Sequence, residues 1–298
     1  MKTIITIGLC LVSGVLLAQG KLSFNPEKGS KYEYKVEIKQ SEQQSANNME
    51  LPIEETVNME FLMNINEKEE VRFTWQNISY LLSSPILRME YDSKKPKRNP
   101  TALDNMHEKI LGSAIGKSFS LSIAPDGSIS SITGVDIITE ASKQAVASDV
   151  VADAEMGEEL HKSLTDNWIG EDALKKMIEQ SFNLFHSDEV NVGDSWTKES
   201  VYNISNGLTF KNAFTLKSIK NGSATISVKS IVEQESKSGA DYKLTGTQSG
   251  NVTVNTKTGI PISSDLTVNV KGRILIMQRI EGQMNIVERM KSTIKEVQ

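Results

Sequence analysis

Hydrophobic and polar residues alternate along most of this chain. Residues 32–38 place Tyr, Tyr, Val and Ile at every second position with charged residues between them, as in a strand that buries one face. The same alternation over residues 56–80, interrupted by the polar stretch Glu67-Lys68-Glu69, predicts a hairpin. We therefore expect antiparallel sheets that each bury one face.

Turn signals separate further alternating segments in both halves of the chain. Asp126-Gly127, Asn206-Gly207 and Asn221-Gly222 are dipeptides that suit tight hairpin turns, because such turns require positive φ angles. Thr258-Gly259 marks a further turn between alternating segments. The tail from Ile274 to Val297 is amphipathic, and its pattern favours a closing strand over a helix.

Helical spacing occurs in two places. A helix is predicted near residues 101–116, after a Thr101 cap. The segment 135–186 lacks alternation and predicts two or three helices, with breaks near Gly157 and Gly170. Apolar residues spaced for one face of its last helix are Leu174, Met177, Ile178 and Phe185.

The two β-rich halves align with each other, which predicts an internal duplication. Gly29-Ser30-Lys31-Tyr32 aligns with Gly193-Asp194-Ser195-Trp196, and Phe61 and Met63 align with Phe214 and Leu216. Alternation alone would also align any two antiparallel sheets.

The predicted fold class is α+β, mainly antiparallel β, with two curved sheets from the duplication packed with a central helical segment. The predicted division is a signal peptide over 1–18, a first β-rich half over 19–134, a helical segment over 135–186 and a second β-rich half over 187–298.

The first residues have the pattern of a secretory leader. Met1-Lys2 precedes an apolar run from Thr3 to Leu17, which is short for a bilayer span, and Ala18 supplies a small residue at the expected cut. We expect cleavage near Ala18, a periplasmic or secreted location and no transmembrane segment afterwards. The alternative is lipid attachment at Cys10, although Leu9 is a poor residue to precede such a cysteine.

Composition removes several classes of function. Cys10, the only cysteine, lies in the leader, so a mature chain without it has no disulfide, thiolate metal site or cysteine nucleophile. A formal net charge of −5 argues against nucleic acid as a partner. Hydrophobic residues make up 38%, which together with the strong alternation indicates sheets rather than disorder.

With its leader, a Gly-x-x-Tyr first strand at Gly29–Tyr32 and paired sheets around a helical middle, the chain resembles an uncharacterised secreted family of Gram-negative bacteria. The resemblance extends from about Leu22 onward. It implies an exported location and this fold. It supplies no site residues, because the family has no assigned activity.

Two motifs resemble a nucleotide and a metal site but depart from them, and two further histidines stand alone. Gly112–Ser118 has three residues between its glycines where a phosphate-binding loop needs four. His107-Glu108 is followed by Leu111 where a zinc helix needs a second histidine. His161 and His186 have no partner at ligand spacing and are interpreted as surface or boundary residues.

Two charged stretches are interpreted as solvated surface. The acidic residues Asp149, Asp153, Glu155, Glu158 and Glu159 lack the order of a calcium loop. The basic stretch Lys94–Arg98 is interpreted as an exposed connection. No catalytic, cofactor or metal site is assigned, and no Gly-x-Ser-x-Gly nucleophile motif occurs.

Three functional hypotheses remain, and a non-enzymatic role is favoured over an enzyme. The first is an exported carrier that encloses a lipid or other apolar molecule, with Met59, Met63, Met89 and Met284 as candidates to line an adaptable pocket. Ordinary core packing is the alternative explanation of these methionines. The second hypothesis is an envelope scaffold or protein-interaction component. The third is a hydrolase whose carboxylates meet only in the fold.

Overall fold

A computed structural model gives the structure of the chain. It describes residues 19–46, 49–66, 70–95, 99–147, 154–202, 208–234, 244–276 and 280–297. The predicted leader with its cut near Ala18, and the turn residues 67–69 and 206–207, lie outside the described residues.

The dominant element is one 12-stranded antiparallel sheet, counted over the described residues. Its strands in spatial order are β7 (Ile129–Thr133), β6 (Ser118–Ile123), β4 (Glu70–Ser83), β3 (Met49–Ile65), β2 (Lys31–Ala46), β14 (Ile280–Glu296), β13 (Pro261–Ile276), β12 (Leu244–Asn255), β11 (Ser223–Gln234), β10 (Leu208–Lys220) and β9 (Ser195–Tyr202). Beside this path β5 (Arg88–Asp92) pairs with β4, and β1 (Gln19–Gly20) pairs separately with β8 (Val190–Asn191).

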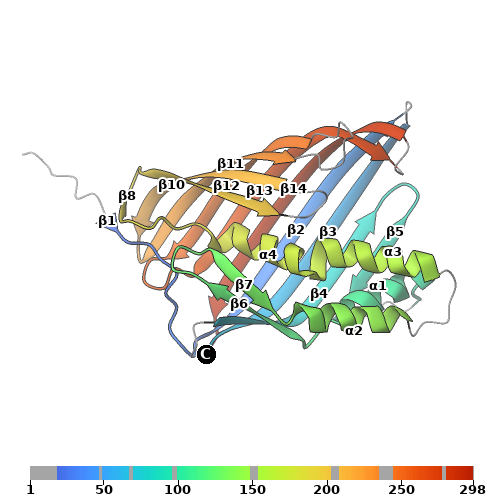
Figure 1. Cartoon of the computed structure of the whole chain (residues 1–298), viewed down its shortest axis with the longest axis horizontal. Helices are drawn as coiled ribbons and strands as arrows, with labels where there is room; N and C mark the ends of the chain where they lie inside the picture. The colour runs from blue at the N-terminus through green and yellow to red at the C-terminus, as the bar shows by residue number, and fades with distance from the viewer. Residues whose placement is uncertain are drawn as a thin grey trace, which may run out of the picture.

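The predicted antiparallel β architecture with helices is confirmed, but the two predicted sheets are joined into one. The tail forms β14, as its pattern predicted, and β14 pairs along β2 from Tyr32–Glu296 to Ser45–Gln283. This pairing covers the edges that β2 and β14 would otherwise expose to other chains. Figure 1 shows the resulting sheet, in which blue and red strands lie side by side at the centre.

The helices all pack on one face of the sheet, which we call the inner face (Figure 1). They are α1 (Ala102–Gly112), α2 (Val135–Ala147), α3 (Ala154–Leu164), the π-helical turn η1 (Thr165–Ile169) and α4 (Glu171–Phe182). The predicted Thr101 cap is confirmed, and Asp104 completes a capping box. Within the described ranges, no helix is both long and apolar enough to cross a bilayer.

The predicted helix breaks have different outcomes. Gly170 ends η1 and begins α4, as expected. Gly157 instead lies inside α3, so a break there was wrong. A Cβ at Gly157 would come within 3.1 Å of a methyl group of Val146 in α2, so the glycine provides close packing between the two helices.

The inner face of β2 and its neighbours forms the main core. Tyr32, Tyr34, Val36 and Ile38 are buried there, as the alternation predicted. Aromatic rings continue the core across the next strands, with 5.3 Å between the ring centres of the stacked pair Phe73 and Phe119. Of the predicted buried face of α4, Leu174, Met177 and Ile178 pack against this core, whereas Phe185 is buried beyond the end of the helix at Phe182.

The duplication stays a prediction, and its alignment needs a correction of two residues in the second strand. Gly29 donates from its backbone N–H to the carbonyl of Ile65 at 2.9 Å, and Gly193 donates in the same way to Leu216 at 2.8 Å. Ile65, rather than Met63, therefore corresponds to Leu216. Alternation fixes which face a residue occupies but leaves the register free in steps of two residues.

Candidate functional site

A row of mostly polar side chains crosses the apolar inner face of the sheet. Each member lies directly opposite the next on the neighbouring strand, from β10 to β3. In order, the members are Asn212, Ser230, Gln248, Val268, Glu288, Gln40 and Glu55. We call this set the polar row.

The buried half of the polar row is hydrogen-bonded internally. The Ser230 hydroxyl lies 2.6 Å from Asn212 Oδ1 and 3.0 Å from Gln248 Oε1. Asn212 donates to the Ser200 hydroxyl at 3.4 Å. These contacts offset much of the cost of placing amides and hydroxyls within an apolar face.

The polar row separates two apolar regions of the inner face. On one side lies the main core, whose adjacent row runs from Leu266 through Met290 and Ile38 to Val57. On the other side a second apolar cluster gathers, and we call it the upper cluster. The buried members of the upper cluster are Ala173, Phe210, Val232, Leu244, Val268 and Val270.

The apolar surface of the upper cluster is interrupted by a glycine, and the helices cover it only in part. Gly246 lies directly between Val232 and Val270 in the register and places no side chain there. Met284 and Ile286 continue the apolar surface on β14 and are only half-buried. Figure 1 shows β2, β3 and β14 running on past α3 and α4, so this end of the inner face extends beyond the helices.

A cavity of about 390 Å³ lies between the inner face and the helices at this point. Trp168 of η1 and Met177 of α4 line it opposite the sheet, and Phe210, Val270 and Ile286 line it from the strands. Its volume falls within the range of about 300–1,000 Å³ that is typical of small-molecule sites. The lining is mainly apolar. We call the part of it around Gln40, where Glu42, Glu55 and Glu288 lie on three adjacent strands, the polar end.

Glu55 is the most perturbed acid at the polar end. The pKa of its carboxyl is raised to about 6, chiefly by burial and also by the negative charges of Glu288 and Glu42, against hydrogen bonds from Tyr80 and Trp168 that lower it. Burial, and then the charge of Glu55, raises the pKa of Tyr80, which keeps its hydroxyl protonated as a donor. The cavity is therefore lined mostly by apolar side chains and has acidic side chains at its polar end.

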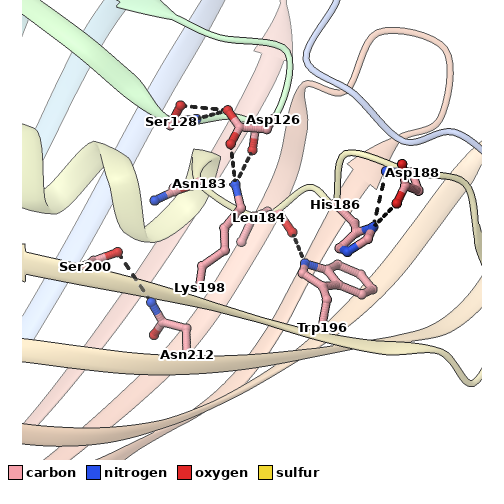
Figure 2. Close-up of polar contacts among 10 residues, drawn as sticks. All are labelled: Asp126, Ser128, Asn183, Leu184, His186, Asp188, Trp196, Lys198, Ser200 and Asn212. Atoms are coloured by element: carbon pink, nitrogen blue, oxygen red, sulfur yellow. Dashed lines mark hydrogen bonds and ion pairs between the residues drawn. The ribbon is translucent and has the colours of Figure 1, made fainter.

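The C-terminal end of α4 is fixed over the sheet by Lys198, which lies opposite Asn212 at the end of the polar row (Figure 2). The ammonium of Lys198 donates to Asp126 Oδ2 at 2.9 Å, to the Asp126 carbonyl at 2.8 Å and to Asn183 Oδ1 at 2.8 Å. Nearby, the indole of Trp196 donates to the Leu184 carbonyl at 2.8 Å. These bonds fix the C-terminal end of α4, whose side chains line the cavity opposite the sheet.

The Asp126 carboxylate in this cluster stays ionised more readily than usual. Burial alone would raise its pKa, but hydrogen bonds from Ser128 and Lys198 outweigh burial and lower the pKa. The Ser128 hydroxyl donates to the same carboxylate at 2.6 Å.

The four candidate methionines divide between cavity and core. Met59 and Met284 line the cavity, as the carrier hypothesis expected. Met63 and Met89 are buried in the main core instead. Met59 is also a buried member of the main core, so ordinary packing accounts for three of the four, and only Met284 lines the cavity without belonging to the core.

The residues of the two motifs and the two further histidines make local contacts within the fold. Lys117 of the glycine-flanked segment donates to the Ser113 carbonyl at 2.6 Å, just after the end of α1. His107 is buried in α1, with Nδ1 2.9 Å from the Leu103 carbonyl. His161 contacts the Ser142 hydroxyl at 2.8 Å, and His186 lies at the surface within 3.9 Å of Asp188.

The charged stretches agree with a solvated surface where they are described. Glu158 and Glu159 are exposed, while Asp149, Asp153 and residues 96–98 lie outside the described residues. Lys94 pairs with Glu60 at 2.7 Å. In the part of the chain that the structure describes, no group of three His, Cys, Asp or Glu side chains is placed to hold a metal ion.

The sequence analysis missed the acids of the polar end, although it contained a signal for them. The inner-facing alternation of β2 continues beyond Ile38 into Gln40, Glu42 and Gln44, which are polar residues on the face that should be apolar. Such a change of polarity on one face marks either a strand leaving the core or a lined site.

Comparison with known proteins gives a family. Residues 66–261, more than half of the 298-residue chain, match the model described as a family of unknown function (DUF6263). The chain belongs to this family. The expectation of an uncharacterised family is thereby confirmed, whereas its secreted Gram-negative character stays a prediction. None of the curated proteins matches the sequence.

Among solved structures, the chain is similar to one titled for lipid–protein interactions in lipovitellin, with a TM-score of 0.50 and 9% identity over 90% of this chain. The match covers 25% of that chain, so this protein spans about a quarter of its length. At this identity the likeness concerns the fold alone. An outer membrane channel from Pseudomonas putida F1 also matches, with 8% identity over 93% of this chain and 98% of the other, but its TM-score of 0.22 is too low for an argument.

Proposed function

We propose that this protein binds a lipid or another apolar molecule in the cavity beside the upper cluster, and that it does so as an exported protein. The observation that carries the proposal is the cavity of about 390 Å³ between the sheet and α4, lined mainly by apolar side chains. Half-buried Met284 and Ile286 give it an apolar surface that a ligand would cover. Each buried methylene of such a ligand contributes about 0.8 kcal/mol.

Two further observations support binding of this kind. Met59, Met177 and Met284 give the lining unbranched side chains that adapt to ligands of different shape. The fold is similar to part of a protein whose structure is titled for lipid–protein interactions. The leader pattern of residues 1–18 supports export.

The experiment uses Trp168 as an internal reporter, since it lines the cavity while Trp75 and Trp196 are buried in the core. A long-chain alcohol brominated at the end of its chain should quench Trp168 fluorescence saturably. The quenching should disappear in Trp168→Phe.

A matched pair of variants tests the place of binding. Ile286 faces the cavity, whereas its neighbour Val287 is exposed on the opposite face of β14. Ile286→Phe should narrow the cavity and weaken binding about tenfold, and Val287→Phe should leave it unchanged. Equal affinity in both variants, or no saturable quenching of the wild type, would reject the proposal.

A further inference from the structure

The apolar part of the cavity runs across the strands rather than along them. Five residues lie directly opposite one another on successive strands of the inner face, and we call this set the apolar row. From β10 to β14 its members are Phe210, Val232, Gly246, Val270 and Ile286. Phe210, Val270 and Ile286 line the cavity. None of the five has a polar side chain, so the sheet presents a continuous apolar surface across five strands.

The register gives the length of this surface, and the volume of the cavity gives its width. Neighbouring strands lie about 4.8 Å apart, so the four spacings from β10 to β14 span about 19 Å. A cavity of about 390 Å³ that extends over at least this length has a mean cross-section of about 20 Å², which equals a channel about 5 Å wide. Carbon atoms in contact lie about 4 Å apart, so the channel accepts one hydrocarbon chain and excludes two side by side.

The two ends of the apolar row differ in exposure. Phe210 on β10 is 2% exposed and Val232 on β11 is 0% exposed, so this end is closed. Ala173 of α4 packs with both residues and covers them. On β14, by contrast, Ile286 and its neighbour Met284 are only half-buried. The channel is therefore open beside β14.

On the basis of the proposed function, we infer that the ligand is a lipid with one unbranched chain, which lies across the strands along the apolar row. The chain enters beside Ile286, and its terminal methyl group lies near Phe210. Each carbon of an extended chain advances roughly 1.25 Å, because C–C bonds of about 1.5 Å follow a zigzag, so about 15 carbons fill the row. Branched chains and fused rings are wider than the channel, so the shape of an apolar molecule determines whether it binds.

The test measures how affinity depends on chain length and shape, by displacement of the brominated alcohol that quenches Trp168. Straight-chain primary alcohols should bind about fourfold more tightly for each added methylene up to about 15 carbons, and should gain little beyond that length. Pentadecan-1-ol should bind at least tenfold more tightly than its branched isomer 2-hexylnonan-1-ol, because the two arms of the isomer do not fit side by side in the channel.

A substitution at the closed end tests where the chain lies. Ala173 lines the cavity, so Ala173→Leu should fill this end of the channel. Because Leu adds three carbon atoms to Ala, the gain with chain length should stop about three carbons earlier. The affinity for decanol, which is too short to reach this end, should change less than twofold and reports that the variant is folded. The matched control is Ala213→Leu, because Ala213 is exposed on the face of β10 opposite the cavity, and this variant should leave every affinity unchanged.

The outcomes separate the inference from the proposed function. An affinity that stops rising by ten carbons, equal binding of the two isomers, or an unchanged length limit in Ala173→Leu would overturn the inference and leave the proposed function intact. Binding of none of the alcohols would overturn the proposed function itself.

Discussion

Replacing Glu55 by Gln should stabilise this protein, and only above a defined pH. The carboxyl of Glu55 has its pKa raised from 4.5 to about 6, chiefly by burial. In the pH range between these values the folded state binds more protons than the unfolded state, so stability falls as the pH rises. The loss is complete above about pH 6, where the folded protein holds an ionised carboxylate.

The size of the effect follows from the pKa. The rise is roughly 1.5 units, and each unit corresponds to about 1.4 kcal/mol, which gives an upper limit of about 2 kcal/mol. Because Glu55 is only half-buried, solvent screening should reduce the effect to about 1 kcal/mol. Gln retains a side-chain oxygen that accepts from Tyr80 and Trp168, so the substitution removes the charge and keeps these bonds.

The assay is urea unfolding of wild type and Glu55→Gln, followed by tryptophan fluorescence from pH 4 to 8 at constant ionic strength. The variant should match the wild type below about pH 4.5 and exceed it by about 1 kcal/mol above pH 6.5. Glu54→Gln serves as the control and should stay within about 0.5 kcal/mol throughout. A stability difference that is independent of pH, or a Glu55→Gln variant that is less stable at pH 8, would refute the reasoning.

Three more predictions concern stability and are checked by thermal and urea unfolding. Gly127→Ala should destabilise by more than about 2 kcal/mol, because φ is +83° and a Cβ would lie 1.7 Å from a backbone oxygen. Gly29→Ala should be milder, because Gly29 has a similar φ of +80° but nothing lies within 4 Å of its Cβ position. Equal effects of the two substitutions would contradict this reasoning. Lys198→Met should destabilise by about 1 kcal/mol, because the partly exposed Asp126 carboxylate keeps only its bonds from Ser128, and a neutral result would show that the cluster does not fix α4. Burial lowers the pKa of His107, so the unfolded state binds the proton more readily and stability should fall below about pH 6.5. His107→Gln should reduce this fall, and an unchanged pH profile of stability in the variant would contradict the prediction.

The elements themselves could be predicted from the sequence, because periodicity and turn chemistry are local. The positive φ angles of Asn221 and Gly222, 51° and 74°, match the predicted hairpin turn between β10 and β11. The Thr101 cap and the buried face of α4 were predicted for the same reason. The tail was also predicted correctly as a strand.

The pairing and register of strands far apart in the sequence could not be predicted from local residue patterns. Pairing of β14 with β2 joins segments near the two ends of the described chain, and the residue pattern of neither segment specifies the other as its partner. This single pairing turns two predicted sheets into one. It also places Glu288 and Glu55 on either side of Gln40.

The candidate site was missed for the same physical reason. Four methionines were candidates for a pocket, with core packing as the alternative; Met59 and Met284 line the cavity, while Met63 and Met89 are in the core. The acids became visible only when the strands were in register, since a lone polar residue in a strand is ordinarily a solvated one. Gln40, Glu42 and Gln44 on one face of β2 were the signal that a sequence alone contained.

The most direct test of the central claim is native mass spectrometry of the protein purified from its own cells without detergent. We expect a one-to-one adduct with the mass of a single lipid or similar apolar molecule. Ile286→Phe should reduce the adduct, and Val287→Phe should retain it. A wild-type protein without any adduct, or an adduct that both variants carry equally, would contradict ligand binding in the cavity between the sheet and α4.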